Sequence, residues 1–237
     1  MTFRWDWEVF LRDTGGGQTY LDWMLSAWGW TLAVSACAWV IALVTGSVMG
    51  TIRTVPQAGW RRLGDAWVEL FRNIPLLVQI FVWYHVIPAI FPPMKDLSAF
   101  VLVVFALGFF TSARVAEQVR AGIQSLARGQ RMAGQAIGLT LPQTYRYVLL
   151  PMAFRIVLPP LTSEAMNIIK NSSVAFAVGI SELTLFAMQA QEETSRGIEV
   201  YLAVTGLYMV SAFAVNRVLA WIESRVRVPG YIAAEAK

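Results

Sequence analysis

Residues 23–52 read WMLSAWGWTLAVSACAWVIALVTGSVMGTI, and none of them carries a charge. A helix must contain about 20 mostly apolar residues to cross the hydrocarbon core of a bilayer, because each residue advances the helix by about 1.5 Å. This uncharged stretch exceeds that length. It therefore predicts a membrane-spanning helix, which we place at about 22–48.

The composition of the whole chain agrees with a membrane protein. Of the 237 residues, 57% are hydrophobic and 14% are charged, whereas an average soluble domain has about 45–50% apolar and about 25% charged residues. This composition excludes a disordered chain and most soluble enzymes. Because the sequence has one Cys and one His, we expect no Cys-based or His-rich metal site in it. Since it also has no cluster of His with Glu, Asp or Ser, we expect no catalytic residue.

Three further windows without charged side chains, extended at their ends, predict spans at about 67–91, 97–120 and 199–222. The segment 157–188 is mostly apolar although it contains Glu164, Lys170 and Glu182, and we interpret it as a fifth span. The predicted fold is an all-α membrane protein of about five transmembrane helices, in one domain that covers 1–237. With five spans, the two ends of the chain lie on opposite sides of the membrane.

The distribution of basic residues predicts the orientation. Four basic and eight acidic residues lie in the segments 1–22, 90–98 and 190–199. Twelve basic and four acidic residues lie in the segments 50–65, 114–156 and the tail from 223. Since Lys and Arg accumulate in cytoplasmic loops, we predict an external N-terminus and a cytoplasmic C-terminus. The net charge of +4 then reflects contact with the lipid bilayer, and no nucleic-acid partner is expected.

The longest predicted loop, about 121–156, lies in the cytoplasm in this orientation. A short helix is predicted before Gly138, which is a good helix stop, and Pro142 opens a second helical stretch in its first turn. Ala133, Gly134 and Gly138 leave one surface nearly without side chains. Such a surface suits close docking on another protein. A hairpin packed on its own helix bundle is the alternative interpretation.

This loop resembles a motif of the membrane subunits of bacterial ABC importers. Those subunits carry E-A-A-x-x-x-G, followed about nine residues later by I-x-L-P, and the segment forms the coupling helix that seats on the ATPase subunit. The corresponding residues here are 132–138 (MAGQAIG) and 148–151 (VLLP). Met132 stands where the general motif has Glu, so we expect no ion pair from this position to the ATPase, while the glycine spacing and the Leu-Pro end of the motif still predict the docking role.

The resemblance covers nearly the whole chain and points to the polar amino-acid uptake family, in particular to its glutamate/aspartate permeases. Its other matching stretches are 5–7 (WDW), 53–56 (RTVP), 69–76 (ELFRNIPL), 111–130, 159–172 and 226–230 (VRVPG). It implies a permease subunit of an ATP-driven importer in the bacterial inner (cytoplasmic) membrane. The implied coupling residues are Gln130, Met132, Ala133, Gly134, Ala136, Gly138, Leu139 and Pro142.

The resemblance also implies the partners of the chain. They are an ATP-binding subunit dimer, a second permease that is identical or homologous, and a periplasmic amino-acid-binding protein. The sequence has no G-x-x-x-x-G-K-[ST] phosphate-binding loop and no Gly-Lys dipeptide. We therefore expect that this chain is not an enzyme and holds no cofactor, and that ATP and Mg²⁺ bind to the partner ATPase.

Polar residues at helical spacing in the fifth span are candidates for the solute path. Ser163, Asn167 and Lys170 are three to four residues apart, with Asn171 beside them. A charge inside the bilayer is costly and is therefore first interpreted as functional. A cation at Lys170 would attract the side-chain carboxylate of glutamate or aspartate. The alternative is a structural lysine near the interface, or an ion pair with Glu164, although about 240° around a helix separates those two residues.

A self-sufficient secondary transporter or channel for a small polar solute is the alternative function. It requires paired acids or a proton relay inside the spans, and usually internal inverted repeats; the sequence shows neither clearly. Two structural predictions complete the analysis. Gly46-x-x-x-Gly50 allows another helix to approach closely, and Arg114, Glu117 and Arg120 are spaced to form a network within one helix.

Overall fold

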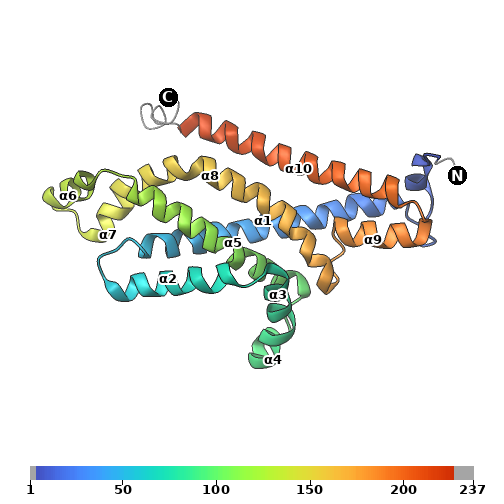
Figure 1. The fold of residues 1–237 in the computed structure, drawn as a ribbon, viewed down its shortest axis with the longest axis horizontal. Coiled ribbons are helices and arrows are strands. Elements are labelled where there is room, and N and C mark those ends of the chain that lie inside the picture. Colours follow the sequence, from blue (N-terminus) through green and yellow to red (C-terminus); the bar gives the residue numbers. More distant parts are fainter. Residues whose placement is uncertain (1–3, 227–237) are drawn as a thin grey trace. The chain divides into compact units, whose positions relative to one another are not determined.

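The computed structural model describes residues 4–226, which form helices and no β-strand (Figure 1). The long helices are α1 (Tyr20–Ile52), α5 (Ala99–Gln124), α8 (Leu150–Asn171) and α10 (Gly197–Val226). The shorter ones are η1 (Trp7–Leu11), α2 (Ala58–Asn73), α3 (Leu76–Phe81), η2 (Val82–Val86), α4 (Ile87–Ile90), η3 (Pro92–Met94), α6 (Arg128–Ala136), α7 (Leu141–Thr144), η4 (Tyr145–Leu149), η5 (Ser172–Val178) and α9 (Leu183–Thr194). Of the stretch 226–230, which resembles the permease family, residues 227–230 lie outside the described residues.

The predicted all-α membrane fold is confirmed. Four helical segments are long and apolar enough to cross a membrane, namely Tyr20–Ile52, Ala99–Gln124, Leu141–Val178 and Gly197–Val226. A bent pair, Ala58–Asn73 with Leu76–Ile90, is the fifth candidate span. The single transmembrane domain over 1–237 stays a prediction, because both ends of the chain lie outside the described residues.

The expected second span, 67–91, is not one straight helix. The chain turns by 104° between Ala58–Asn73 and Leu76–Ile90. Pro75 causes the break, because its ring removes an N–H donor and disfavours the helical conformation of the residue before it. Ile74 is accordingly extended, with φ −101° and ψ 129°. The first part of the expected span therefore belongs to the amphipathic helix α2.

The expected fifth span, 157–188, starts and ends earlier in the structure. The candidate span runs over Leu141–Val178, through α7, η4, α8 and η5. It ends at Gly179, whose φ of +79° suits glycine at a helix end. Glu182 lies beyond this end and begins α9 as its N-cap. The predicted loop 121–156 thus contains α6 and the beginning of a long helix.

The chain divides into two compact units. The first contains the chain up to Trp39, Pro75–Gly108 and Asn167–Ala214. Its core joins η1, the start of α1, α9 and the start of α10 through buried apolar side chains that include Val9, Phe186 and Val200. The Trp23 ring meets the Phe186 ring edge-on at 5.1 Å between centroids. These contacts hold the N-terminal turn on α9 and α10.

A buried carboxylate fixes the start of α9 within the first unit. The Glu182 side chain is fully buried and accepts the backbone N–H groups of Thr184 at 2.9 Å and Leu185 at 3.0 Å. The Tyr208 hydroxyl donates to the same carboxylate at 2.7 Å. Because an N-cap acceptor satisfies donors that the helix leaves unpaired, this arrangement makes a buried helix start tolerable.

The second unit contains Val40–Ile74, Phe109–Met166 and the part of α10 that begins at Val215. Here the predicted close approach at Gly46 and Gly50 is confirmed. A Cβ atom at Gly46 would lie 2.6 Å from the Val115 Cβ, and one at Gly50 would lie 2.6 Å from the Ala116 carbonyl oxygen. The two glycines therefore allow the end of α1 to pack directly on the α5 backbone.

The charged residues of α5 pair with other helices and not with one another, which corrects the expected network within one helix. Glu117 accepts from the Arg72 Nη1 of α2 at 2.6 Å. Arg114 lies 3.6 Å from the Glu164 carboxylate of α8. Arg120 similarly reaches an acidic residue of α2, at 3.7 Å. Helices packed on both sides of α5 supply opposite charges, so the spacing within α5 alone does not determine the partners.

Candidate functional site

The predicted cytoplasmic hairpin is formed by α6, a tight turn and α7. Helix α6 ends before Gly138, which has a φ of +91°. The Gly138 N–H donates to the Gln135 carbonyl at 3.0 Å, and the Leu139 N–H donates to the Gly134 carbonyl at 3.1 Å. These bonds satisfy the last carbonyls of α6 in the way typical of a glycine-ended helix. The predicted helix stop at Gly138 is therefore confirmed.

The second arm of the hairpin starts with a capping box. The Thr140 N–H donates to Gln143 Oε1 at 2.8 Å, and the Gln143 N–H donates to Thr140 Oγ1 at 3.5 Å. Pro142 occupies the first turn of α7, as predicted, where its missing N–H costs nothing. Both ends of the turn are therefore fixed by residues close in sequence.

Gly134 does not lie on an exposed docking surface, contrary to what the sequence had led us to expect. It is buried, and a Cβ atom at this position would lie 2.9 Å from the Thr144 Cγ2. Its small size therefore serves the packing of α6 on the chain's own second arm. Ala133 and Gly138, the other two residues of the expected surface, are exposed. The sequence shows which residues are small, but the direction in which each one faces follows from the turn geometry.

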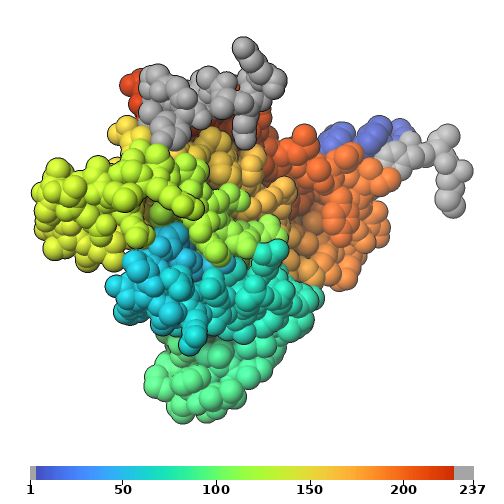
Figure 2. Space-filling view, turned by 60° about the vertical axis from the view of Figure 1, so that its left-hand side comes forward, coloured from blue at the N-terminus to red at the C-terminus, as the bar shows by residue number. Residues whose placement is uncertain are grey.

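Two large apolar side chains of the hairpin are exposed among polar ones such as Arg128 and Gln135, and we call these two its apolar face. Met132 is 67% exposed and Ile137 is 78% exposed, and the hairpin forms the yellow-green surface of Figure 2. Of the remaining predicted coupling residues, Ala136 and Pro142 are exposed and Gln130 and Leu139 are partly buried. Large apolar side chains exposed on a short hairpin are candidates for a contact with another protein. Ile137 was not among the predicted coupling residues, although an Ile just before a helix-ending glycine was a visible signal.

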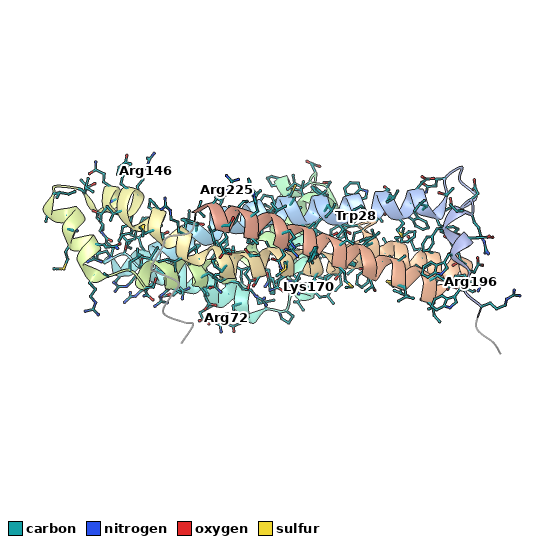
Figure 3. The ribbon with its side chains drawn as sticks, turned by 90° about the horizontal axis from the view of Figure 1, so that it is seen from above. Trp28, Arg72, Arg146, Lys170, Arg196 and Arg225 are labelled. Carbon is teal, nitrogen blue, oxygen red and sulfur yellow. The ribbon has the colours of Figure 1, made fainter. Side chains whose placement is uncertain are left out.

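The predicted solute-path residues all lie on α8. Ser163 and Lys170 are exposed, and Asn167 and Asn171 are partly buried. Among residues 4–226, no acidic side chain pairs with Lys170, which is labelled in Figure 3. Glu164 pairs with Arg114 instead. Within the described part of the chain, the helix therefore presents a cation and two amides whose side chains make no hydrogen bond.

A polar pocket of about 450 Å³ in the second unit was not predicted as a site. It is lined by Arg72, Phe110, Arg114, Glu117, Gln118 and Glu164. Glu164 Oε2 is buried and accepts no hydrogen bond within the described part of the chain, and the Arg114 guanidinium lies over the Phe110 ring at 5.5 Å. The walls of this pocket therefore carry two pairs of opposite charges, Arg72 with Glu117 and Arg114 with Glu164. The signal in the sequence was Glu164 inside an apolar segment.

No metal site is found in the part of the chain that the structure describes. Within residues 4–226, no three or more His, Cys, Asp or Glu side chains converge to hold an ion. The candidate sites are therefore the exposed hairpin, the polar residues of α8 (Ser163, Asn167, Lys170 and Asn171) and the charged pocket.

The sequence of the chain is similar to known transport proteins. The family described as "Binding-protein-dependent transport system inner membrane component" matches residues 42–228. The glutamate/aspartate import permease protein GltJ of Escherichia coli (strain K12) is 44% identical over 241 residues, which cover 97% of this chain and 98% of that protein. The probable amino-acid ABC transporter permease protein PatM of Vibrio harveyi is 32% identical and covers 86% of this chain and 91% of its own length.

Solved structures show the same fold. A crystal structure of an amino acid ABC transporter with histidines has a TM-score of 0.75 and 29% identity, and it covers 87% of this chain and 95% of the matched one. The MetNI methionine ABC transporter in an inward-facing form has a TM-score of 0.73 and covers 88% of this chain and 98% of its own. At 20% identity, the second likeness supports the fold alone.

Proposed function

The chain belongs to the family of binding-protein-dependent transport system inner membrane components, and we propose that it is the permease subunit of an ATP-driven importer whose solutes are glutamate and aspartate. The solute assignment is supported by 44% identity to the glutamate/aspartate import permease over nearly all of both chains. It is also supported by the cation at Lys170. Alternating access between two such permease subunits provides the path.

The proposed setting is the bacterial inner membrane, with the N-terminus outside and the C-terminus in the cytoplasm. The excess of basic residues in 50–65 and 114–156 supports this orientation. An external amino-acid-binding protein delivers the solute, and a second permease, identical or homologous, completes the path. ATP and Mg²⁺ bind to a separate ATPase dimer, since this sequence contains no phosphate-binding loop.

The observation that carries the proposal is the exposed apolar face of the hairpin. Met132 projects from α6 and Ile137 from the start of the turn, which local hydrogen bonds fix. We assign this face to the ATPase, because a rigid apolar projection can fill a groove and transmit a displacement without deforming. The loss of Glu at position 132 makes the contact apolar instead of charged.

Leu139→Asp tests the assignment, because Leu139 is a partly buried residue two positions after Ile137 and an ATPase seated on this face would bury the added charge. Burying an unpaired carboxylate costs several kcal/mol, and each 1.4 kcal/mol corresponds to a factor of ten. We expect uptake in proteoliposomes containing the whole complex to fall about tenfold or more, while the binding protein still binds solute. Gln57→Asp, which adds the same charge at the exposed N-cap of α2, should transport normally. Wild-type uptake by Leu139→Asp would contradict the assignment.

Lys170→Gln tests the solute path. Removing the cation should lower the transport of glutamate relative to glutamine, because only glutamate has a side-chain carboxylate for Lys170 to attract. A surface-type charge contact contributes about 0.2–1 kcal/mol, so we expect about a 1.5- to 5-fold change in the ratio of the two uptake rates. Lys170→Arg keeps the charge and should preserve the ratio. An unchanged ratio in Lys170→Gln would assign Lys170 to structure.

A further inference from the structure

The two arms of the hairpin meet at Gly134, where the packing leaves no room for a side chain. A Cβ atom there would lie 2.9 Å from Thr144 Cγ2 and 3.3 Å from Thr144 Oγ1. Thr144 itself is fully buried, and its hydroxyl donates to the Thr140 carbonyl at 3.0 Å. The two arms therefore meet without a gap, and a displacement of α6 must displace Thr144.

The residue after Thr144 reaches a different part of the second unit. The Tyr145 hydroxyl lies 3.0 Å from Thr54 Oγ1, at the end of α1. The Thr54 hydroxyl donates its only proton to the Thr51 carbonyl at 2.7 Å. Tyr145 must therefore be the donor and Thr54 the acceptor. This bond joins residues 91 positions apart in the sequence, and the Tyr145 side chain that makes it is 6% exposed.

The chain around Thr54 is not a loose loop. The neighbouring Arg53 donates through Nε to Asp65 Oδ1 at 2.7 Å, and Arg120 of α5 approaches the same oxygen at 3.7 Å. A Cβ atom at Gly64 would lie 2.5 Å from the Arg53 Cγ. Because Arg53 is held by α2 and near α5, movement at Thr54 passes to helices and is not absorbed by the turn.

We propose that the hydrogen bond from Tyr145 to Thr54 is a mechanical link that carries displacement of the coupling hairpin to the end of α1. The inference rests on the proposed function of the hairpin as the ATPase contact. The continuous path is α6, Gly134, Thr144, Tyr145 and Thr54. Tyr145 and Thr54 are positioning residues, since they contact neither the solute nor the nucleotide. Their role is to make ATP-driven movement productive.

Tyr145→Phe and Thr54→Val test the link, because each removes the hydrogen bond with little change of shape. The measurement is the number of solute molecules taken up per ATP hydrolysed, by the whole complex in proteoliposomes. One hydrogen bond of ordinary net strength corresponds to about a 2- to 12-fold change in an equilibrium. We expect each variant to lower this coupling ratio by that factor, and the double variant to be no worse than either single one. Thr54→Ser keeps the acceptor and should restore the ratio.

Matched controls separate the link from general stability. Tyr147→Phe alters a tyrosine that is 62% exposed, and Thr51→Val removes a hydroxyl that donates to Ser47 of its own helix. Both should keep the wild-type coupling ratio. Gly134→Ala should lower the ratio by pushing on Thr144, and adding Thr144→Ser, which removes the nearest atom, should restore it.

The outcomes distinguish the link from the proposed function. If Leu139→Asp abolishes uptake while Tyr145→Phe and Thr54→Val keep the wild-type ratio, the link is wrong and the ATPase contact stands. If Leu139→Asp transports normally, the ATPase contact fails and the link fails with it. Additive effects of Tyr145→Phe and Thr54→Val would also overturn the link, because they would show two independent roles. Copurification of the ATPase with each variant confirms that the complex has assembled.

Discussion

Gly50→Ala is the sharpest test of how the second unit is packed. The added Cβ would lie 2.6 Å from the Ala116 carbonyl oxygen, 2.9 Å from the Val119 Cβ and 3.1 Å from the Ala116 Cα. Ordinary contact begins at 3.4 Å, so α1 and α5 must separate by about 0.8 Å. Two of these atoms belong to the backbone of α5 and the third is a Cβ atom, so none of them can rotate away. The separation must therefore also loosen the neighbouring contact at Gly46.

The magnitude follows from two opposing terms. Overpacking of a well-packed contact costs about 1–3 kcal/mol, and the backbone position of the nearest atoms places this site in the upper part of that range. Replacing Gly by Ala inside a helix returns about 1 kcal/mol. We therefore expect a net loss of about 1–2 kcal/mol in the free energy of unfolding. For a chain of this size, this corresponds to a melting temperature about 2–8 °C lower.

The assay is thermal unfolding of the full chain in lipid nanodiscs, followed by tryptophan fluorescence. Gly29→Ala is the matched control, because it lies in the same helix and has no atom within 4 Å of its added Cβ. It should gain the helix propensity without the clash and raise the melting temperature by about 2–4 °C. Equal shifts of the two variants would refute the argument that the glycines permit the close approach.

Two further predictions concern helix ends. Gly138→Val forces a branched side chain into a φ of +91°, which costs about 1–2 kcal/mol. Hydrogen exchange of the α6 amides should therefore become about 5- to 30-fold faster. The control Gly129→Ala adds a Cβ in open space and should slow this exchange. Glu182→Ala removes the buried N-cap of α9 and should lower the melting temperature by about 2–8 °C. Glu192→Ala, exposed on the same helix, should leave it unchanged; equal shifts would assign no capping role to Glu182.

The parts of the fold that local chemistry determines could be predicted from the sequence. Gly138 and Pro142 specify where α6 stops and α7 starts, and the structure places both as expected. The apolar windows identified the long helices. Counting charges, however, measures only the polarity of a segment and does not show where the helix axis changes direction. It therefore merged the end of α2 with the helix after Pro75, although the proline itself marks the break.

Side-chain partners and facing directions could not be predicted in the same way. Arg114 pairs with Glu164 because α8 packs beside α5, and nothing in the local sequence of either helix specifies that neighbour. Gly134 was expected on the docking surface but faces Thr144. The same limitation hid Ile137, whose exposure follows from the direction of the turn. These residues depend on tertiary contacts, which a single sequence does not contain.

The local hydrogen bonding of the hairpin affects whether mutant alleles of this protein are dominant or recessive. Every hydrogen bond that shapes its turn joins residues within five positions of one another, as between Leu139 and Gly134. None of these bonds needs α9 or α10, so a chain in which those helices are damaged can still form the turn. A chain damaged in its later helices would still present that face and occupy the partner that intact copies need. Alleles that disrupt α9 or α10 should therefore interfere with a wild-type copy in the same cell, whereas alleles that also break the turn should be recessive.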